Sequence, residues 1–334
     1  MLKIAVLGCG RIGRMHAETI SLHADAALTG VFDVYAPAAE DVAARFDVQN
    51  FASAKDVFAS GDVDAILIAT TTPTHVGFIE QGVAAGKPIL CEKPIDLSLN
   101  RVNACADKIA GTSVPIMLGF CRRFDPGHRA ARQAVRDGEV GDLHQVIITS
   151  RDPGMAPAAY VETSGGIFRD MTIHDLDLAR YMLGEEVATV SAHGSRLVDP
   201  DLMAKCDDYD TVVVTLTTAS GKQAVITNSR AAAYGYDQRV ELFGSKGMVI
   251  SGNRHETPVT KHLANATNIS APLQNFFIER YHEAFVAEID SFVKAARGAP
   301  VEVGFEDGRA ALVLADAAVR SVEESRVVAV SEIA

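Results

Sequence analysis

The sequence is poor in cysteine, and the few cysteines that it has are scattered. Its 334 residues include five, an odd number, widely spaced and without a CxxC pair: Cys9, Cys91, Cys105, Cys121 and Cys206. This pattern argues against a disulfide framework and against a zinc site. We therefore expect a protein of a reducing compartment, the cytoplasm.

Positive charge is also in short supply. The chain has 31 Lys and Arg against 43 Asp and Glu, which gives a formal net charge of -12 and a pI near 5.3. Such a chain offers no basic stripe to a phosphate backbone, so nucleic acid and anionic membrane surfaces are poor candidate partners. A small molecule is the expected partner.

Long apolar runs are missing as well. Charged or turn residues interrupt every candidate before the ~18 residues that a membrane span requires. The N-terminal MLKIAVLGCG contains an apolar segment of about six residues, which is shorter than the ~7–15 of a secretory signal. The sequence therefore predicts neither a membrane span nor export.

What the sequence does contain, over residues 1–120, is an alternation of apolar runs with helical patterns. The runs are KIAVLGC, AALTGVFDV, DAILIAT, KPILCEKP and VPIMLGF. They are apolar at nearly every position, as is typical of parallel strands that are covered on both faces. This region predicts a doubly wound α/β domain, a parallel Rossmann sheet that binds a dinucleotide.

The rhythm changes after Phe120. A helical stretch near 125–137 leads to strands that alternate or pair through tight turns, in TVVVTLTTASGKQAVITNS and QRVELFGSKGMVI. The tail returns to amphipathic helix in FFIERYHEAFVAEIDSFVKAARG and EDGRAALVLADAAVRSVEE. Residues 121–334 therefore predict a second, α+β domain with a mostly antiparallel open sheet, which we assign to substrate binding and oligomerisation.

The segment GCGRIG follows the first strand and opens the first helix, so it matches GxGxxG in the required context. Gly8 permits the tight turn, Gly10 lets the backbone approach a pyrophosphate, and Gly13 allows close packing of helix and strand. The free N–H groups of the helix start, at Arg11 and Ile12, are expected to bind the phosphates.

An acidic residue, Asp33, ends the second strand 20 positions after Gly13, which is the spacing of a ribose-binding carboxylate. A carboxylate accepts hydrogen bonds from both ribose hydroxyls but repels a 2′-phosphate. The residues that follow, Val34 and Tyr35, supply no arginine for that phosphate. The sequence therefore favours NAD over NADP.

Two more segments at strand ends complete the expected cofactor site, TTTPTH after DAILIA and EKP after PILC. Loops at the carboxyl ends of parallel strands carry the ligand chemistry of open α/β sheets. Lys93 in such a loop can reach a substrate oxygen beside the nicotinamide, although its position alone fits a surface lysine equally well. The residues expected to contact the cofactor here are Thr70, Thr71, Pro73, His75, Glu92 and Lys93.

The stretch GGIFRDMTIHDLDLAR, residues 165–180, packs four ionisable side chains behind a glycine pair. On a helix, Asp170, His174 and Asp177 share one face at i, i+4 and i+7, whereas Asp175 points away. That arrangement fits a metal site and a proton-transfer site equally well, and a solvated helix face is the third interpretation.

Together these motifs resemble the glucose-fructose oxidoreductase and inositol dehydrogenase family. The similarity rests on GCGRIG, CEKP and the Gly-Gly, Asp-Met, His-Asp pattern of 165–175, in that order. The later segments GFCRRFDPG, AAYGYDQRVELFGSKG and FFIERYHEAF resemble the myo-inositol 2-dehydrogenase branch. The resemblance spans essentially the whole chain.

The resemblance implies a catalytic set of Lys93, Asp170 and His174. Oxidation of a secondary alcohol sends a hydride to the nicotinamide and the hydroxyl proton to a base. His174 is suited to accept that proton near neutral pH, Asp170 to orient and stabilise its imidazolium, and Lys93 to stabilise negative charge on the substrate oxygen. Because NAD supplies the electron sink, this chemistry needs no Lewis acid, and we expect no metal.

A neutral polyol requires a pocket of fixed hydrogen-bond donors and acceptors. Besides Lys93, Asp170 and His174, the candidates for this pocket are Arg122, Arg123, Asp152, Asp177, Tyr234 and Tyr236. The resemblance implies that Arg122, Asp177 and the two tyrosines contact the ring, whereas for Arg123 we expect an interdomain ion pair. Some inositol dehydrogenases carry His-Arg-Asn-Pro where this chain has SRDP, at 150–153. This departure leaves the preferred stereoisomer open.

The expected function is the NAD-dependent oxidation of a ring hydroxyl of a cyclic polyol to a ketone, with myo-inositol going to 2-keto-myo-inositol as the first choice. Another inositol isomer or a sugar such as glucose is the near alternative, and a non-catalytic NAD-binding sensor is the distant one. The resemblance also implies a homo-oligomer, either a tetramer or a dimer.

Overall fold

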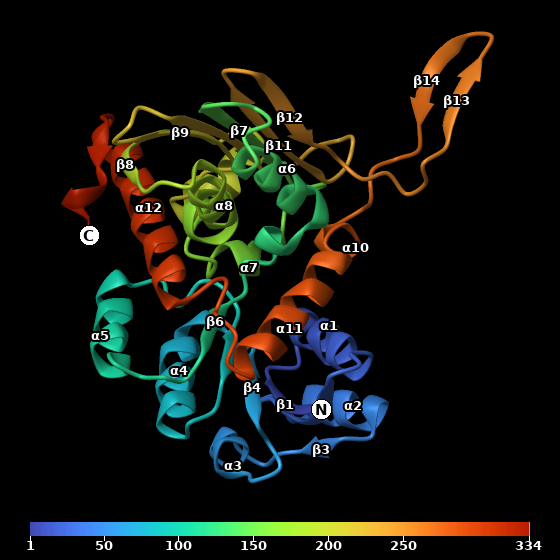
Figure 1. Cartoon of the computed structure of the whole chain (residues 1–334), viewed down its shortest axis with the longest axis vertical. Helices are drawn as coiled ribbons and strands as arrows, with labels where there is room; N and C mark the ends of the chain where they lie inside the picture. The colour runs from blue at the N-terminus through green and yellow to red at the C-terminus, as the bar shows by residue number, and fades with distance from the viewer. Residues whose placement is uncertain (334) are drawn as a thin grey trace. The chain divides into compact units, whose positions relative to one another are not determined.

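The computed structural model describes residues 1–333, which form two compact units (Figure 1). The first unit holds residues 1–124 together with 283–310, and the second holds residues 125–282 and the chain from 311 onward. A single division after residue 120 does not describe this arrangement. The chain returns to the first unit, where the N–H of Leu118 donates to the carbonyl of Val303 at 2.9 Å.

The first unit confirms the predicted parallel sheet. Its strands within the described chain follow the order β3-β2-β1-β4-β5-β6. Their bounds are β1 (Leu2–Leu7), β2 (Ala26–Phe32), β3 (Gln49–Asn50), β4 (Ala65–Ile68), β5 (Ile89–Cys91) and β6 (Ile116–Leu118). The order reverses between β1 and β4, so the loops that follow Leu7 and Ile68 are the expected ligand-binding loops.

Helices connect these strands at the places that the sequence predicts. Their bounds are α1 (Arg11–Ser21), α2 (Ala36–Phe46), α3 (Ala54–Ala59), α4 (His75–Ala84), α5 (Leu99–Ile109) and, from the later return of the chain, α11 (His282–Ala296). The side chain of Ser53 caps α3 by accepting from the N–H of Asp56. The short strand β3 was not predicted, because its two residues are polar and exposed.

The second unit confirms the mostly antiparallel open sheet. Among residues 1–333 its strand order is β12-β11-β7-β10-β9-β8-β15, and the β7–β10 pair is parallel. The strands are β7 (Leu143–Arg151), β8 (Val187–Ser195), β9 (Thr211–Thr218), β10 (Gln223–Ser229), β11 (Asp237–Gly244), β12 (Gly247–Ser251) and β15 (Val328–Ala329).

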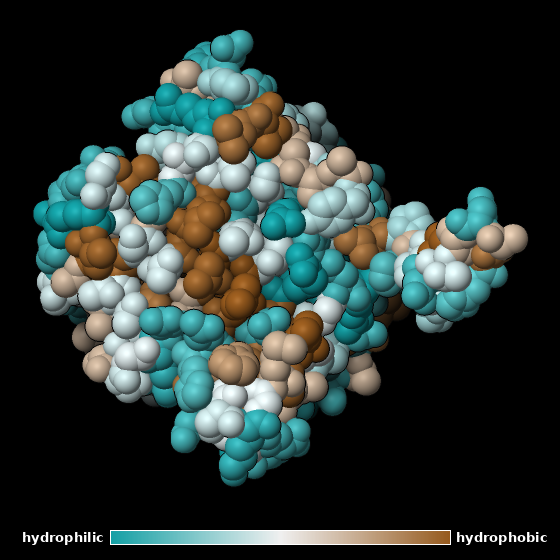
Figure 2. Space-filling view, turned by 90° about the horizontal axis from the view of Figure 1, so that it is seen from above, coloured by the Kyte–Doolittle hydropathy of each residue, from teal (hydrophilic) through white to brown (hydrophobic). Residues whose placement is uncertain are grey.

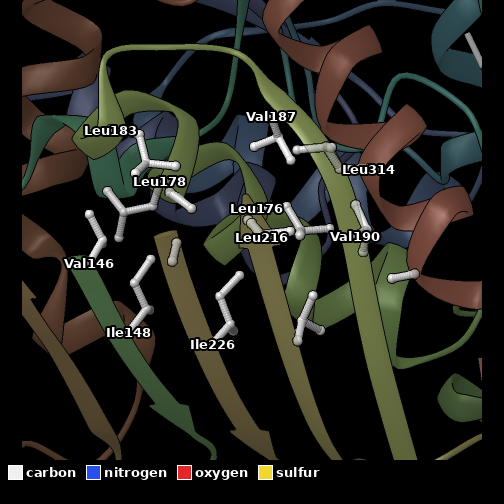
Figure 3. Close-up of a cluster of buried hydrophobic side chains, with 14 of the residues drawn as sticks. Val146, Ile148, Leu176, Leu178, Leu183, Val187, Val190, Leu216, Ile226 and Leu314 are labelled. Carbon is white, nitrogen blue, oxygen red and sulfur yellow. The ribbon is translucent and has the colours of Figure 1, made fainter. Parts of the chain in front are cut away.

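One face of this sheet carries the core of the second unit (Figure 3). Side chains of α8 (Ile173–Leu183) lie against alternate residues of the strands, and Leu314 of α12 (Phe305–Glu324) packs beside them. Leu176 and Leu216 are both fully buried. Each such side chain contributes about 1.5–3 kcal/mol relative to exposure, so α8 is fixed firmly on the sheet.

The remaining elements are short. The helices are α6 (Pro126–Arg136), α7 (Ala158–Val161), α9 (Pro200–Cys206), α10 (Phe277–Arg280) and the single turns η1 (Thr72–Thr74), η2 (Cys121–Phe124), η3 (Phe168–Thr172) and η4 (Val330–Glu332). A hairpin of β13 (Thr260–Leu263) and β14 (Ala266–Ser270) stands away from the sheet (Figure 1), and its residues are exposed. In the part of the chain that is described, every helix is too short or too polar to cross a membrane.

Candidate active site

The glycine loop has the geometry that its sequence predicts. Gly8 adopts a φ of +96°, and a Cβ there would lie 2.4 Å from the carbonyl oxygen of Ala69. A Cβ on Gly13 would lie 1.8 Å from the carbonyl oxygen of Gly8. Both positions therefore exclude every side chain. The loop packs on β4 and on the first turn of α1 with no room for a larger residue.

Gly10 plays a different part, because it borders open space. A Cβ at Gly10 would meet no atom of the described residues within 4 Å. Gly10 is also the N-cap of α1, and as a glycine it brings no side chain to accept a hydrogen bond from the first turn. The N–H groups of Arg11 and Ile12 thus lie at a helix start that is open to an anion. This cradle fits the pyrophosphate of a dinucleotide.

Asp33 lies directly beside this loop. One of its carboxylate oxygens accepts from the N–H of Cys9 at 2.6 Å and the other from the N–H of Tyr35 at 2.8 Å. The carboxylate is therefore held by the backbone at the end of β2, and each oxygen retains a lone pair for a ribose hydroxyl. Burial and this neighbouring negative charge raise the pKa of the Cys9 thiol to about 12, so Cys9 is an inert packing residue.

The loops after β4 and β5 are tied together by His75. Its ring is buried, with Nδ1 2.8 Å from the carbonyl oxygen of Pro94 and Nε2 3.0 Å from that of Thr70. His75 thus braces the two cofactor loops rather than offering its ring to a ligand. The peptide between Lys93 and Pro94 is cis. Thr71 is exposed in the same loop.

Glu92 belongs to a buried cluster that the sequence did not reveal. Its Oε1 lies 2.7 Å from Nε2 of His16 on α1. The carboxyl of Glu288 on α11 lies beside both, since one ligand atom of each residue falls within 4.8 Å of the others. Among the described residues, neither oxygen of Glu288 has a hydrogen-bond partner. Burial and the charge of Glu92 raise the pKa of Glu288 well above its ordinary value.

The two arginines of GFCRRFDPG are buried side chains of the first unit. Arg122 is 6% exposed and Arg123 is 9% exposed. Nη2 of Arg123 donates to Oδ1 of Asp307 at 2.9 Å, and Asp307 also belongs to the first unit. Arg123 is therefore part of an ion pair that holds the returning chain within the first unit.

In the second unit, the predicted Asp152 lies where the ends of β7 and β10 meet the start of β11. The register pairs Arg151, the last residue of β7, with Ser229 at the end of β10 and with Asp237 at the start of β11. The N–H of Asp152 donates to the carbonyl of Ser229 at 3.0 Å. Residues next to these strand ends, among them Asp152 and Arg230, are thereby brought side by side.

The stretch 165–180 forms a π-helical turn, η3, that continues into α8 without a break in the helical dihedral angles. π-helical turns occur often at functional sites. Asp170 lies in that turn and His174 one turn later, and both are half-buried. Oδ1 of Asp170 accepts from the hydroxyl of Tyr160 at 2.6 Å, and Oδ2 accepts from Nη1 of Arg230 at 3.1 Å. Sequence reasoning missed both partners, because neither lies in a recognisable motif.

The two later aspartates are both buried, and Asp175 differs from the helical-wheel interpretation. Asp175 was expected to point away and to be an ordinary helix residue, yet it is fully buried and accepts from Nδ2 of Asn228 at 2.9 Å. It therefore anchors α8 to β10. Asp177 is 1% exposed. The packing of α8 between neighbours on several sides, which a wheel of one helix does not show, explains the burial of both carboxylates.

The glycine pair before this helix also has a local explanation. Gly165 and Gly166 have φ values of +85° and +84°, which other residues rarely adopt. A Cβ on Gly166 would lie 3.0 Å from Oδ1 of Asp208, and that oxygen accepts from the N–H of Ile167 at 2.9 Å. The backbone conformation of both residues and the approach of Asp208 to Gly166 therefore require glycine.

The two tyrosines of YGY have different surroundings. Tyr236 is 4% exposed and packs edge to face against Phe276, with ring centroids 5.6 Å apart. Tyr234 is 54% exposed, and its hydroxyl accepts from Arg151 and donates to Asp237, both at 2.6 Å. In SRDP, the hydroxyl of Ser150 is buried and donates to Gln238 at 2.9 Å. Asp152 is the half-buried acidic side chain of that segment.

The strand order, the glycine loop and the position of Asp33 define an NAD-binding oxidoreductase of the Rossmann class. Comparison with known proteins agrees: residues 2–120 match the description "Oxidoreductase family, NAD-binding Rossmann fold", and residues 128–250 match "GFO/IDH/MocA C-terminal domain". The chain belongs to the GFO/IDH/MocA family of oxidoreductases.

Individual relatives cover the chain from end to end. An inositol 2-dehydrogenase of Rhizobium meliloti (strain 1021) is 47% identical over 332 residues, which cover 99% of each chain. A myo-inositol dehydrogenase structure from Corynebacterium glutamicum superposes with a TM-score of 0.95 at 44% identity, over 98% of each chain. A scyllo-inositol dehydrogenase of Lactobacillus casei with bound NAD(H) and scyllo-inositol gives a TM-score of 0.92 at 30% identity, over 99% of each chain.

Proposed function

We propose that this enzyme oxidises one ring hydroxyl of an inositol to a ketone, and that its substrate is myo-inositol, which becomes 2-keto-myo-inositol. The observation that carries the proposal is the helical turn of Asp170 and His174. A carboxylate held by Tyr160 and Arg230 lies one turn before an imidazole. The names of the relatives that match over the whole chain support an inositol as the substrate.

Bound NAD supplies the hydride acceptor for this reaction. The side chains then have to move one proton and stabilise charge. His174 accepts the proton of the hydroxyl as the carbon loses its hydride, and Asp170 stabilises the imidazolium that results. The ammonium group of Lys93 stabilises the negative charge that develops on the substrate oxygen.

The remaining hydroxyls of the ring require donors and acceptors. We assign this binding role to Arg122, Asp152 and Asp177, with Tyr234 and Tyr236 beside them. The role of Asp152 is supported by its position beside Arg230, at the paired ends of β7 and β10. The support for the tyrosines is weaker, because the hydroxyl of Tyr234 already bonds to Arg151 and Asp237.

The stereoisomer is the part of the proposal that most needs a test. A relative with 30% identity binds scyllo-inositol, in which every hydroxyl is equatorial, whereas myo-inositol has one axial hydroxyl. We propose to assay the purified protein by NADH absorbance with NAD and, in turn, myo-, scyllo- and chiro-inositol and glucose. The highest kcat/KM is expected with myo-inositol. A preference for glucose, or the absence of turnover with every inositol, would contradict the proposal.

A variant separates the enzyme from a sensor that binds NAD without turnover. In His174→Ala the proton acceptor is lost, so kcat should fall by about 100-fold or more, while the affinity for NAD stays unchanged. Isothermal titration with NAD measures the affinity. His193→Ala is the matched control, because His193 is an exposed residue of β8. Full activity in His174→Ala would show that another group accepts the proton.

We also propose a cytoplasmic homo-oligomer. The five cysteines are free thiols, as suits a reducing compartment. The second sheet has an exposed face on which apolar side chains gather, as Figure 2 shows near its centre. The exposed apolar residues of that face are Ile147, Val213, Phe243, Met248 and Ile250. A second copy of the chain is the proposed occupant of this face, because an apolar patch of this kind marks an interaction site.

A further inference from the structure

Arg230 is a buried cation that binds two carboxylates at once. It follows β10 directly, and its side chain is 2% exposed. Nη1 lies 3.1 Å from Oδ2 of Asp170, and Nη2 lies 3.2 Å from Oδ2 of Asp208. A planar guanidinium suits two acceptors in fixed directions better than an ammonium does. Its orientation is thus set by both partners.

The second carboxylate leads back to the helix that carries the first. Oδ1 of Asp208 accepts from the N–H of Ile167, the residue immediately before η3. Asp170 lies three residues further along the same segment. Arg230, Asp208 and the start of this helix therefore form a closed ring of contacts, and Asp170 cannot turn away without breaking a bond to a buried charge.

The backbone of Arg230 is itself hydrogen-bonded to a neighbouring segment. Its N–H donates to the carbonyl of Asp210 at 2.8 Å. The carboxylate of Asp210 is fully buried and accepts from the N–H groups of Leu197, Val198 and Asp199. Because the backbone of Arg230 is held in this way, its side chain restricts Asp170 and Asp208 to a narrow range of positions.

The charges of the group are also defined. Burial alone would lower the pKa of Arg230, but the charges of Asp170 and Asp208 raise it, so the guanidinium stays protonated. One cation then faces two carboxylates, which leaves the group with an excess of negative charge next to the turn of His174. The hydroxyl of Tyr160 donates to Oδ1, the other oxygen of Asp170, so both carboxylate oxygens accept a hydrogen bond.

We propose that Arg230 is a positioning residue for the reaction, and that Tyr160 assists it: together they hold the Asp170 carboxylate in one orientation so that it can serve His174. This inference rests on the proposed roles of Asp170 and His174 and assigns a function to two residues outside the known motifs. It predicts that the shape and the charge of Arg230 have separable effects on the rate and on its pH dependence.

The experiment compares Arg230→Lys with Arg230→Met. Lysine keeps the positive charge but cannot donate to both carboxylates in the fixed directions of a guanidinium, so kcat should fall by about 10- to 100-fold. The acid limb of the pH profile of kcat/KM should not move. The methionine also removes the charge. Removing a positive charge from the site favours its protonated form, so the acid limb should move upward by about one pH unit. The affinity for NAD should stay the same in both variants.

Three further variants separate a positioning role from a loss of folding. Arg280→Lys is the matched control, because Arg280 is 2% exposed and pairs with the buried Asp125 at 2.6 Å. It should lower the melting temperature without changing the pH profile. Tyr160→Phe alters a residue that is 50% exposed, so it should fold normally and lower kcat by about five- to tenfold. Tyr181→Phe serves as its control.

The outcomes distinguish this inference from the proposed function. If His174→Ala abolishes turnover while the Arg230 and Tyr160 variants keep the wild-type kcat and acid limb, the positioning role is overturned and the proposed function stands. If the wild-type protein turns over no inositol, NMR titration of the His174 imidazole still tests whether Arg230 acts on this site. A higher imidazole pKa in Arg230→Met supports the inference, and an unchanged one overturns it.

Discussion

At the scale of single residues, the cofactor half of the site depends on a few positions that tolerate one residue type. Gly8 and Gly13 leave no room for a Cβ, and Gly10 borders open space. Asp33 is held by two backbone N–H groups beside that space. Because the same carboxylate supports the loop and faces the expected ribose, changes at Asp33 should be felt in affinity and in cofactor choice.

We predict that Asp33→Asn lowers the affinity for NAD by about 10- to 100-fold, because a charged acceptor is replaced by a neutral one. The ratio of NAD affinity to NADP affinity should fall as well, since the charge that repels a 2′-phosphate is gone. Titration calorimetry with both dinucleotides measures this. Asp62→Asn, at a position with an 85% exposed side chain, should bind both as the wild type does. An unchanged ratio would refute the role of Asp33 in cofactor choice.

At the scale of elements, α11 joins the Rossmann unit through an unusual buried acid. Glu288 is fully buried against Glu92 and His16, and its pKa is raised above its ordinary value of 4.5. The cluster links the helix of the glycine loop, the end of β5 and the returning chain. The sequence pattern of α11 is that of an ordinary amphipathic helix, so its burial against these acids was not predictable.

The raised pKa predicts a pH-dependent stability. Because the folded state holds the Glu288 proton more tightly than the unfolded state, the contribution of Glu288 is fully present below about pH 4.5 and is lost as pH rises toward the folded pKa, by up to about 1.4 kcal/mol per pH unit. In Glu288→Gln this loss is absent. The melting temperature of the variant relative to the wild type should therefore increase from about pH 5 to about pH 8.

Thermal unfolding at several pH values, followed by circular dichroism, measures this difference. Glu283→Gln is the control, because Glu283 is an exposed residue of the same helix. Its melting curve should shift little and by the same amount at each pH. Parallel pH profiles for Glu288→Gln and the wild type would show that Glu288 has an ordinary pKa in the folded protein.

At the scale of the whole molecule, the exposed face of the second sheet is the feature that a single chain leaves unexplained. The sheet buries one face under α8 and α12, whereas Ile147 and Val213 on the other face are 38% and 42% exposed. β-sheets with one apolar face normally cover it. The proposed second copy of the chain would remove this apolar area from water.

We predict that Val213→Glu, combined with Ile147→Glu, reduces the assembly to smaller species, because each chain would have to bury two charges in the interface. Light scattering coupled to gel filtration measures the mass in solution. Leu22→Glu is the control, since Leu22 is 78% exposed and lies at the end of α1 in the other unit. An unchanged mass in the double variant would place the interface elsewhere.

Those parts of the protein whose causes are local were predictable from the sequence alone. Apolar runs and the glycine spacing were sufficient for the Rossmann sheet and its loops, because buried parallel strands and a tight strand-to-helix turn restrict residue type at each position. Alternating strands likewise predicted the second sheet. Lys93, Asp170 and His174 were recognisable from motifs, and their catalytic roles stay predictions.

Features that depend on contacts between distant segments were visible only in the folded structure. It brought 283–310 back to the first unit, buried Asp175 against Asn228, and joined Arg230 to Asp170 across 60 residues. These contacts cannot be predicted from sequence periodicity, because each is made by a single side chain from another element. The physical reason is that burial makes an unpaired charge costly, and which charges are buried is settled only when the elements pack.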